Sequence, residues 1–300
     1  SQSLECCATR SETSYQPRGA LLGRYDEPDP VRVGQRGRLA RGFGVESFVD
    51  GVFCWRVKGV LEAVVDQGFL GSAEGREAPF ACMLANRMPR RVLPVRRADL
   101  PVIDPARRAP SDVDDFVAFV SRMAEQYFTR PNYLPVEGRP YLSIYDSTFF
   151  REELGLEDAG RAIRRARAWL ADHGHPDLHL AAIEPNARAL PEVRRVGFDS
   201  VTHYVFLPEW KGPLLQDYRQ LAERRSSEWL AFAEGSGLPY MPSVAPGWDA
   251  SPRAADFGKM RPDRYPWSPV VTGEHPDLFR KALRRALAFR SPTPVEDPLV

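Results

Sequence analysis

The sequence predicts an α/β protein built as a single (β/α)8 barrel of the TIM type. Short, nearly continuous apolar runs alternate with amphipathic helical patterns, which is typical of parallel strands covered by helices. Polar and aromatic residues follow the ends of these runs, where such a barrel carries its functional groups. No glycine-rich phosphate loop follows an early run, which disfavours a doubly wound nucleotide-binding sheet.

Six apolar runs are predicted strands. They cover residues 47–55, 79–88, 140–147, 178–185, 200–208 and 238–247. The clearest helix begins at Ser111, with Asp114 three residues later in a capping-box arrangement. Further amphipathic patterns predict helices over 156–171, 214–232 and 277–289. Leu299 and Val300 resemble the start of one more strand, so the barrel is expected to lack its last strand or to be truncated there.

Length and charge limit the function classes. The 300 residues suffice for one large domain, and we expect residues 1–20 to form a poorly patterned N-terminal segment and residues 21–300 to form the barrel. The 41 basic and 40 acidic residues give a formal net charge of +1, which offers no global attraction to nucleic acid. No apolar stretch is long enough for a membrane span and the start lacks signal-peptide features, so a cytoplasmic location is expected.

The cysteines and histidines indicate no metal site. Adjacent Cys6 and Cys7 match no zinc spacing, and Cys54 and Cys82 lie inside apolar runs, so reduced thiols are expected. The histidines of residues 173–179 span a helix end, a proline turn and a strand start, which is a poor geometry for zinc. We therefore expect neither a metal nor a cofactor.

The residues just past the predicted strand ends are the first functional candidates, because these positions converge on one mouth of a barrel. They are Trp55, Asn86, Arg87, Tyr145, Asp146, Glu184, Asn186, His203, Tyr204, Trp248, Asp249 and Arg253. Aromatic rings stack on the apolar face of a pyranose while carboxylates, amides and guanidinium groups bind its hydroxyls, so a carbohydrate is the expected partner. For a strand-end carboxylate, capping of the next helix is as good an interpretation as catalysis, above all for Asp146 and Asp249.

Cleavage of a glycosidic bond needs an acid and a base or nucleophile. Glu184 is the first choice of acid because it ends the apolar run before it, and Asp146 and Asp249 are its expected partners. The expected substrate-binding residues are Trp55, Asn86, Arg87, Tyr145, His203, Tyr204, Trp248 and Arg253. The arginine-rich stretch from Arg87 to Arg108 is either a phosphate clamp or a solvated loop balanced by acidic residues.

Residues 244–253, VAPGWDASPR, carry a resemblance to a known family. The segment resembles the Pro-Gly-Trp-Asp-x-x-x-Arg stretch of the glycoside hydrolase family 99-like domain, shared with WbsX-type polysaccharide-biosynthesis proteins. Residues 21–55, 83–93, 136–146 and 275–287 are similar to other segments of that family in order and spacing, with Leu84 for a tryptophan and Glu137 for an aspartate. The resemblance covers roughly residues 21 to 300 and implies a (β/α)8 barrel acting on glycosidic bonds, often mannose-containing ones.

The family's catalytic loop is the main departure. Its members place two essential glutamates in a Trp-Asn-Glu-Trp-x-Glu-Gly segment after the final strand, and this sequence contains no such motif. The resemblance therefore leaves three hypotheses. They are a glycoside hydrolase, a sugar transferase in polysaccharide or glycosylated natural-product biosynthesis, and a carbohydrate-binding barrel without catalysis.

Overall fold

The computed structural model of the protein describes residues 28–55, 58–60, 63–86, 112–250 and 269–292, with residues 53–55 and 58–60 described by their backbone alone. Parallel strands form the centre of this part of the chain, in the order β1-β3-β5-β6-β7. These strands are β1 (Phe48–Trp55), β3 (Phe80–Leu84), β5 (Arg139–Ile144), β6 (His179–Ile183) and β7 (Ser200–Thr202). The α/β class with a parallel sheet is thus confirmed.

Shorter strands extend this sheet. β2 (Lys58–Val60) pairs antiparallel with β1, and β4 (Pro135–Val136) pairs antiparallel with β5. A bridge between Val201 and Tyr240 continues the parallel order beyond β7. A separate parallel pair joins β8 (Leu215–Asp217) to β9 (Val270–Thr272).

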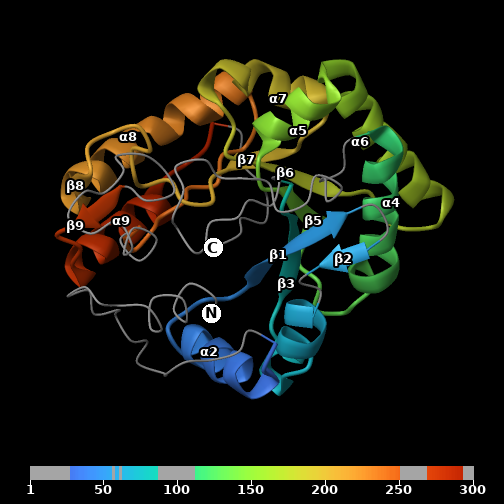
Figure 1. The fold of residues 1–300 in the computed structure, drawn as a ribbon, viewed down its shortest axis with the longest axis horizontal. Coiled ribbons are helices and arrows are strands. Elements are labelled where there is room, and N and C mark those ends of the chain that lie inside the picture. The colour runs from blue at the N-terminus through green and yellow to red at the C-terminus, as the bar shows by residue number, and fades with distance from the viewer. Residues whose placement is uncertain (1–27, 56–57, 61–62, 87–111, 251–268, 293–300) are drawn as a thin grey trace, which may run out of the picture.

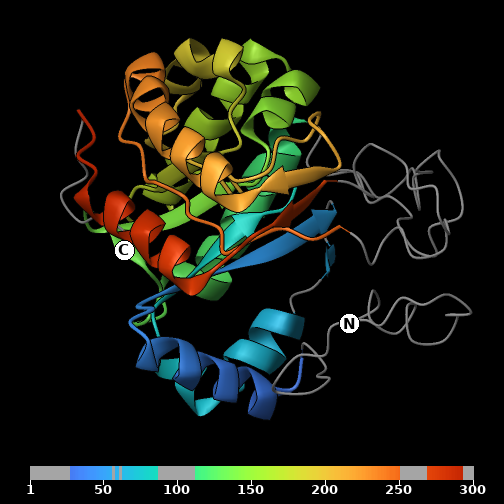
Figure 2. The ribbon, with the colours of Figure 1, turned by 90° about the vertical axis from the view of Figure 1, so that its left-hand side faces the viewer.

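The helices lie along the outer side of the arc of strands (Figure 1). They are α2 (Pro30–Gly42), α3 (Ala73–Glu77), α4 (Val113–Met123), α5 (Ser147–Leu154), α6 (Leu156–Asp172), α7 (Leu190–Val196), α8 (Tyr218–Ser236) and α9 (Pro276–Ala288), with the short π-helices η1 (Val64–Phe69) and η2 (Ala124–Phe128) and the short 3-10 helix η3 (Ala187–Ala189). Figure 2 shows α2 and α3 on one side of the strands and the green-to-orange helices on the other. No helix among the described residues is long and apolar enough to span a membrane.

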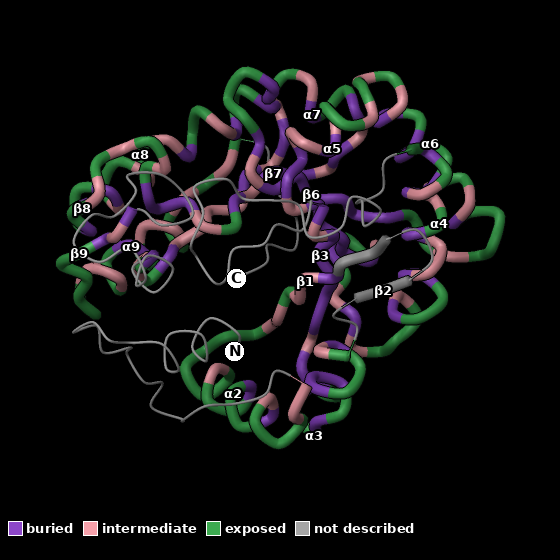
Figure 3. Tube along the Cα trace, in the orientation of Figure 1, coloured by how far each residue is buried: buried purple, intermediate pink, exposed green. Residues whose placement is uncertain are grey.

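The main core lies between the strands and these helices, where the buried residues gather (Figure 3). Every residue of β3 and of β6 is buried, as expected for strands covered on both faces. Phe80 packs against Phe69, Tyr127 and Tyr133 with ring centroids 5.6, 6.2 and 5.2 Å away. α6 buries a stripe of mostly small residues against its neighbours, which are Ala159, Gly160, Ala162, Ile163, Ala166 and Leu170.

Most predicted elements are present with shifted bounds. The first five predicted strands correspond to β1, β3, β5, β6 and β7, and β7 is much shorter than its apolar run. The predicted 238–247 strand contributes one bridge, at Tyr240. The helix expected from Ser111 begins at Val113, because the Asp112 carboxylate caps it by accepting from the Asp115 backbone N–H at 2.8 Å; Ser111 itself lies outside the described residues, as does the 1–20 segment.

Candidate functional site

The carboxyl ends of β5, β6 and β7 bring Glu184, Tyr145 and Tyr204 together. The Glu184 side chain, one residue past β6, accepts backbone hydrogen bonds at Oε1 from Tyr204 at 3.0 Å and from Val205 at 3.3 Å. Tyr204 is 55% exposed and stands edge-on to Tyr145, with ring centroids 5.1 Å apart and planes at 80°. The carboxylate therefore holds the backbone that carries an exposed aromatic ring.

His203 lies on the buried side of the same turn. Its ring stacks on Phe206 at 4.0 Å, meets Phe232 edge-on at 4.5 Å, and places Nδ1 2.9 Å from the Tyr240 hydroxyl. Burial, with a smaller contribution from the Arg225 guanidinium, lowers the pKa of His203 to about 3. His203 is therefore neutral and embedded at neutral pH, which suits an anchor better than a residue that contacts substrate.

Asn86 and Asp146 join the ends of β3 and β5. The Asn86 amide accepts from the Asp146 backbone N–H and donates to the Asp146 carbonyl, both at 2.8 Å, and Asn86 is buried. The Asp146 carboxylate accepts from the Phe149 backbone N–H at 2.8 Å and is the N-cap of α5. The capping interpretation of Asp146 is thus confirmed, and its catalytic role stays a prediction.

Trp248 and Asp249 belong to an adjacent group. Trp248 meets Trp210 edge-on with ring centroids 5.0 Å apart and packs on a second core cluster made of Leu207, Tyr218, Leu221, Ala245 and Val271. Asp249 bridges to Val270 of β9. Val205 packs on the same cluster, so this group adjoins the turn after β7.

Three predicted site residues cannot be placed. Arg87 and Arg253 lie outside the described residues, and for Trp55 only the backbone at the end of β1 is described. Among the residues that are described, no cluster of three or more histidine, cysteine, aspartate or glutamate side chains could hold a metal ion. The candidate residues that the structure places are carboxylates, an asparagine amide, a histidine and aromatic rings.

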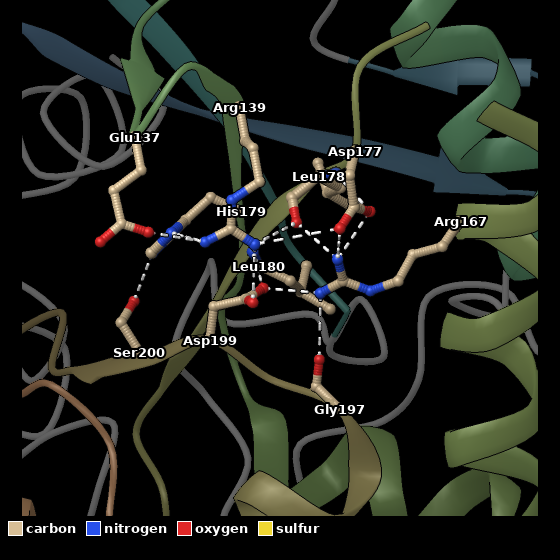
Figure 4. Close-up of polar contacts among 10 residues, drawn as sticks. All are labelled: Glu137, Arg139, Arg167, Asp177, Leu178, His179, Leu180, Gly197, Asp199 and Ser200. Atoms are coloured by element: carbon tan, nitrogen blue, oxygen red, sulfur yellow. Dashed lines mark hydrogen bonds and ion pairs between the residues drawn. The ribbon is translucent and has the colours of Figure 1, made fainter. Parts of the chain in front are cut away.

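A second polar cluster lies at the opposite, amino ends of β5, β6 and β7 (Figure 4). The Asp199 carboxylate accepts from Arg139 at 2.9 Å, from Arg167 at 2.6 Å and from the Leu180 backbone N–H at 2.7 Å. His179 contacts Ser200 at 2.9 Å, and burial lowers its pKa to about 4. Its polar groups bind one another at the end of the sheet that serves stability in such barrels, so we regard it as structural.

Sequence reasoning missed Tyr240 and Asp50. Tyr240 lies inside a predicted strand, and no sequence pattern pairs it with His203. Asp50 lies in β1 opposite Cys82 in the parallel register, between the core residues Phe48 and Val52, with its Oδ2 buried and lacking a hydrogen-bond partner. Burial raises the pKa of Asp50 to about 6 despite the nearby Arg36 guanidinium.

Parallel strands covered by helices, with polar and aromatic side chains at their carboxyl ends, define an α/β protein whose candidate site lies at that end. A family model for the WbsX glycosyltransferases matches residues 8–300, and the chain belongs to this family. The comparison with curated proteins finds no match.

Solved structures share the fold at low sequence identity. The GH99 endo-alpha-mannosidase from Bacteroides thetaiotaomicron is 14% identical with a TM-score of 0.58, and the match covers 90% of this chain and 66% of the mannosidase chain. The same enzyme with BIS-TRIS-propane gives 14% identity, a TM-score of 0.59, and coverage of 90% and 70%. A glycoside hydrolase-like protein is 17% identical with a TM-score of 0.59, and the match covers 91% of this chain and 76% of that protein's chain. The fold is thus of the TIM-barrel type, and this chain spans slightly less than two thirds of the first mannosidase chain.

Proposed function

We propose that this chain acts on a glycosidic bond of a mannose-containing glycan at the carboxyl ends of its strands. The observation that carries the proposal is the contiguous group of Asn86, Asp146, Tyr145, Tyr204 and Glu184, each in contact with the next or adjacent to it in the chain. An amide, carboxylates, the exposed ring of Tyr204 and the partly buried ring of Tyr145 in one place suit a pyranose. Membership in a glycosyltransferase family and a fold like that of endo-mannosidases support carbohydrate as the substrate class.

In hydrolysis, the bond between the anomeric carbon and the leaving oxygen breaks. A carboxylic acid gives its proton to that oxygen, and water supplies the hydroxyl to the anomeric carbon while a carboxylate takes up the second proton. The sequence predicts Asp146, Asp249 and Glu184 as carboxylates for these steps, and of these we propose Asp146 and Asp249 as the pair that carries them out.

Sugar transfer is the second candidate, and the family's description as glycosyltransferases favours it. In transfer, a hydroxyl of an acceptor takes the place of water at the anomeric carbon, and a donor such as a nucleotide sugar supplies the leaving group.

The test is to incubate the protein with an aryl α-mannoside and with α-linked manno-oligosaccharides, with and without a nucleotide-sugar donor. Release of the aryl group or of mannose without donor supports hydrolysis, and consumption of donor supports transfer. Binding of the oligosaccharide without either reaction identifies a carbohydrate-binding barrel. Absence of both binding and reaction across these ligands contradicts the proposal.

A further inference from the structure

The turn that follows β7 is held from two sides. On the inner side, the His203 ring is enclosed by Phe206, Phe232 and Tyr240 and is only 6% exposed. On the outer side, the next residue, Tyr204, is 55% exposed. Burial of one ring thus fixes the direction in which its neighbour leaves the core.

Glu184 holds this turn at the cost of backbone strain. Its φ of 52° is in the left-handed region, which disfavours residues with a side chain, and it precedes Pro185, which restricts the backbone further. Glu137, with a φ of 51°, is explained by the tight turn between β4 and β5, where Gly138 follows with a φ of 73°. Glu184 lies in no such hairpin. Its unusual backbone instead accompanies a side chain that binds the Tyr204 and Val205 amides.

The rings of Tyr145 and Tyr204, at the carboxyl ends of the strands, both belong to segments whose backbone is held by side-chain hydrogen bonds. Tyr145 directly precedes Asp146, whose backbone N–H and carbonyl are bound by the Asn86 amide. The Tyr204 backbone N–H is bound by the Glu184 carboxylate. The rings meet at 80°, so they form an aromatic corner (Tyr145 and Tyr204) that is set before a ligand arrives.

We propose that Glu184 is a positioning residue, not the catalytic acid, and that it fixes the aromatic corner as a subsite that stacks on the apolar face of a hexopyranose. The inference rests on the proposed function for the nature of the ligand. The structure supports it because Glu184 Oε1 is already committed to two backbone donors, whose geometry sets the direction of Tyr204.

Two substitutions separate the roles of Glu184. Glu184→Ala removes the acceptor and is expected to weaken binding of an α-linked manno-oligosaccharide about tenfold, the scale of a lost oriented stacking contact. Glu184→Gln keeps an acceptor oxygen but cannot donate a carboxyl proton, so it is expected to rescue both binding and turnover to within about threefold. Turnover that is lost in Glu184→Gln while binding is kept would overturn the proposal in favour of a catalytic acid.

The path through Tyr204 is tested by a double-mutant cycle. Tyr204→Ala should weaken binding as much as Glu184→Ala does, and the double variant should be no weaker than Tyr204→Ala alone. Additive losses would show that Glu184 does not act through Tyr204. The matched control is Glu137→Ala, which removes the other glutamate with left-handed backbone, at the opposite end of the strands, and should leave binding unchanged.

Hydrogen exchange of the backbone N–H groups tests the positioning role of Glu184 without any ligand, and therefore independently of the proposed function. The backbone N–H groups of Tyr204 and Val205 should exchange at least tenfold faster in Glu184→Ala than in the wild type or Glu184→Gln, whatever the ligand. Unchanged exchange overturns the positioning role. If the wild type binds no manno-oligosaccharide, the proposed function and the sugar subsite fail together, while the exchange rates still decide whether Glu184 holds the turn. Should Glu184→Ala not fold, Glu184→Gln and Tyr204→Ala decide the same question.

Discussion

At the scale of single residues, burial separates groups that serve the fold from groups that are available to a ligand. His203 and Tyr204 are neighbours in the chain, yet one ring is enclosed and the other is half-exposed. The rule that strand-end residues converge places both at the candidate site, but it cannot tell which ring points inward, because that depends on Phe206, Phe232 and Tyr240 from other elements. The same limit applies to Glu184, whose amide contacts follow from its unusual backbone.

Asp50 provides a residue-scale prediction. Its pKa in the folded state, about 6, lies above the ordinary value of 3.8, so between these pH values the folded state binds more protons than the unfolded state. The stabilising contribution of protonated Asp50 to the free energy of unfolding is therefore lost as the pH rises from about 4 to 6. Asp50→Asn should raise the free energy of unfolding at pH 7 by about 1–3 kcal/mol, with little change at pH 4.

Urea unfolding of the wild type and Asp50→Asn at pH 4, 5, 6 and 7 measures this difference. The control is Glu46→Gln, at an exposed position close in the chain, which should change stability by less than about 0.5 kcal/mol at every pH. A gain that is the same at pH 4 and pH 7 would show that the charge of Asp50 is not its cause.

At the scale of secondary-structure elements, side chains at strand and helix ends join neighbouring segments. The Asp146 carboxylate caps α5, while the same residue's backbone is bound by Asn86 from the end of β3. Asp146→Ala should lower the free energy of unfolding by about 1 kcal/mol, whereas Asp146→Asn, an equally good cap, should leave it nearly unchanged. Thermal or urea unfolding checks both. Loss of turnover in Asp146→Asn at unchanged stability would assign a chemical role to this carboxylate, and equal destabilisation by both variants would contradict the capping role.

Asp199 makes the stronger element-scale contact, because it joins the starts of β5, β6 and β7 to α6. Asp199→Ala would leave Arg139 and Arg167 without their shared carboxylate and should lower the free energy of unfolding by about 2–4 kcal/mol. Asp114→Ala is the matched control, since its ion pair with Arg165 is exposed, with 80% and 53% of the side-chain surfaces accessible, and should cost at most about 0.5 kcal/mol. Equal losses in urea unfolding would refute a structural role for the amino-end cluster.

The elements themselves could be predicted where their pattern is long or strongly apolar. β6 and α6 follow their sequence patterns closely, because a fully buried strand or a 17-residue amphipathic helix leaves a clear pattern, whereas β3 covers only the first half of its predicted run. β8 and β9 have three residues each, too few for any period, and exist through their pairing with each other. α5 was missed because its start, Ser147, ends an apolar run that reads as strand. Tertiary contacts therefore decided the short elements.

At the scale of the whole molecule, two buried histidines and the partly buried Asp50 change the free energy of unfolding in opposite directions as the pH falls. His179 and His203 have pKa values of about 4 and 3 in the folded state, below the ordinary 6.5, so the unfolded state binds more protons once the pH falls below 6.5. Their contribution to stability is complete above that pH and declines as pH falls toward 4. Asp50 acts in the other direction, since its contribution improves as pH falls from 6 to 4. In the wild type, the stability gained from Asp50 as the pH falls therefore offsets part of the stability lost from His179 and His203.

Substituting Asp50 should expose the histidine effect. In an Asp50→Asn background, the free energy of unfolding should fall by about 4–6 kcal/mol between pH 6.5 and pH 4.5, at roughly 2–3 kcal/mol for each buried histidine. Adding His203→Asn, whose amide places a polar atom near the position of Nδ1, should remove about half of this fall. His173→Gln, at the exposed end of α6, is the control and should remove none of it. Urea unfolding at half-unit pH steps gives these slopes. If the slope persists unchanged when both His203 and His179 are replaced, acid sensitivity comes from other groups, and the neutral anchoring of the turn beneath Tyr204 loses its energetic support.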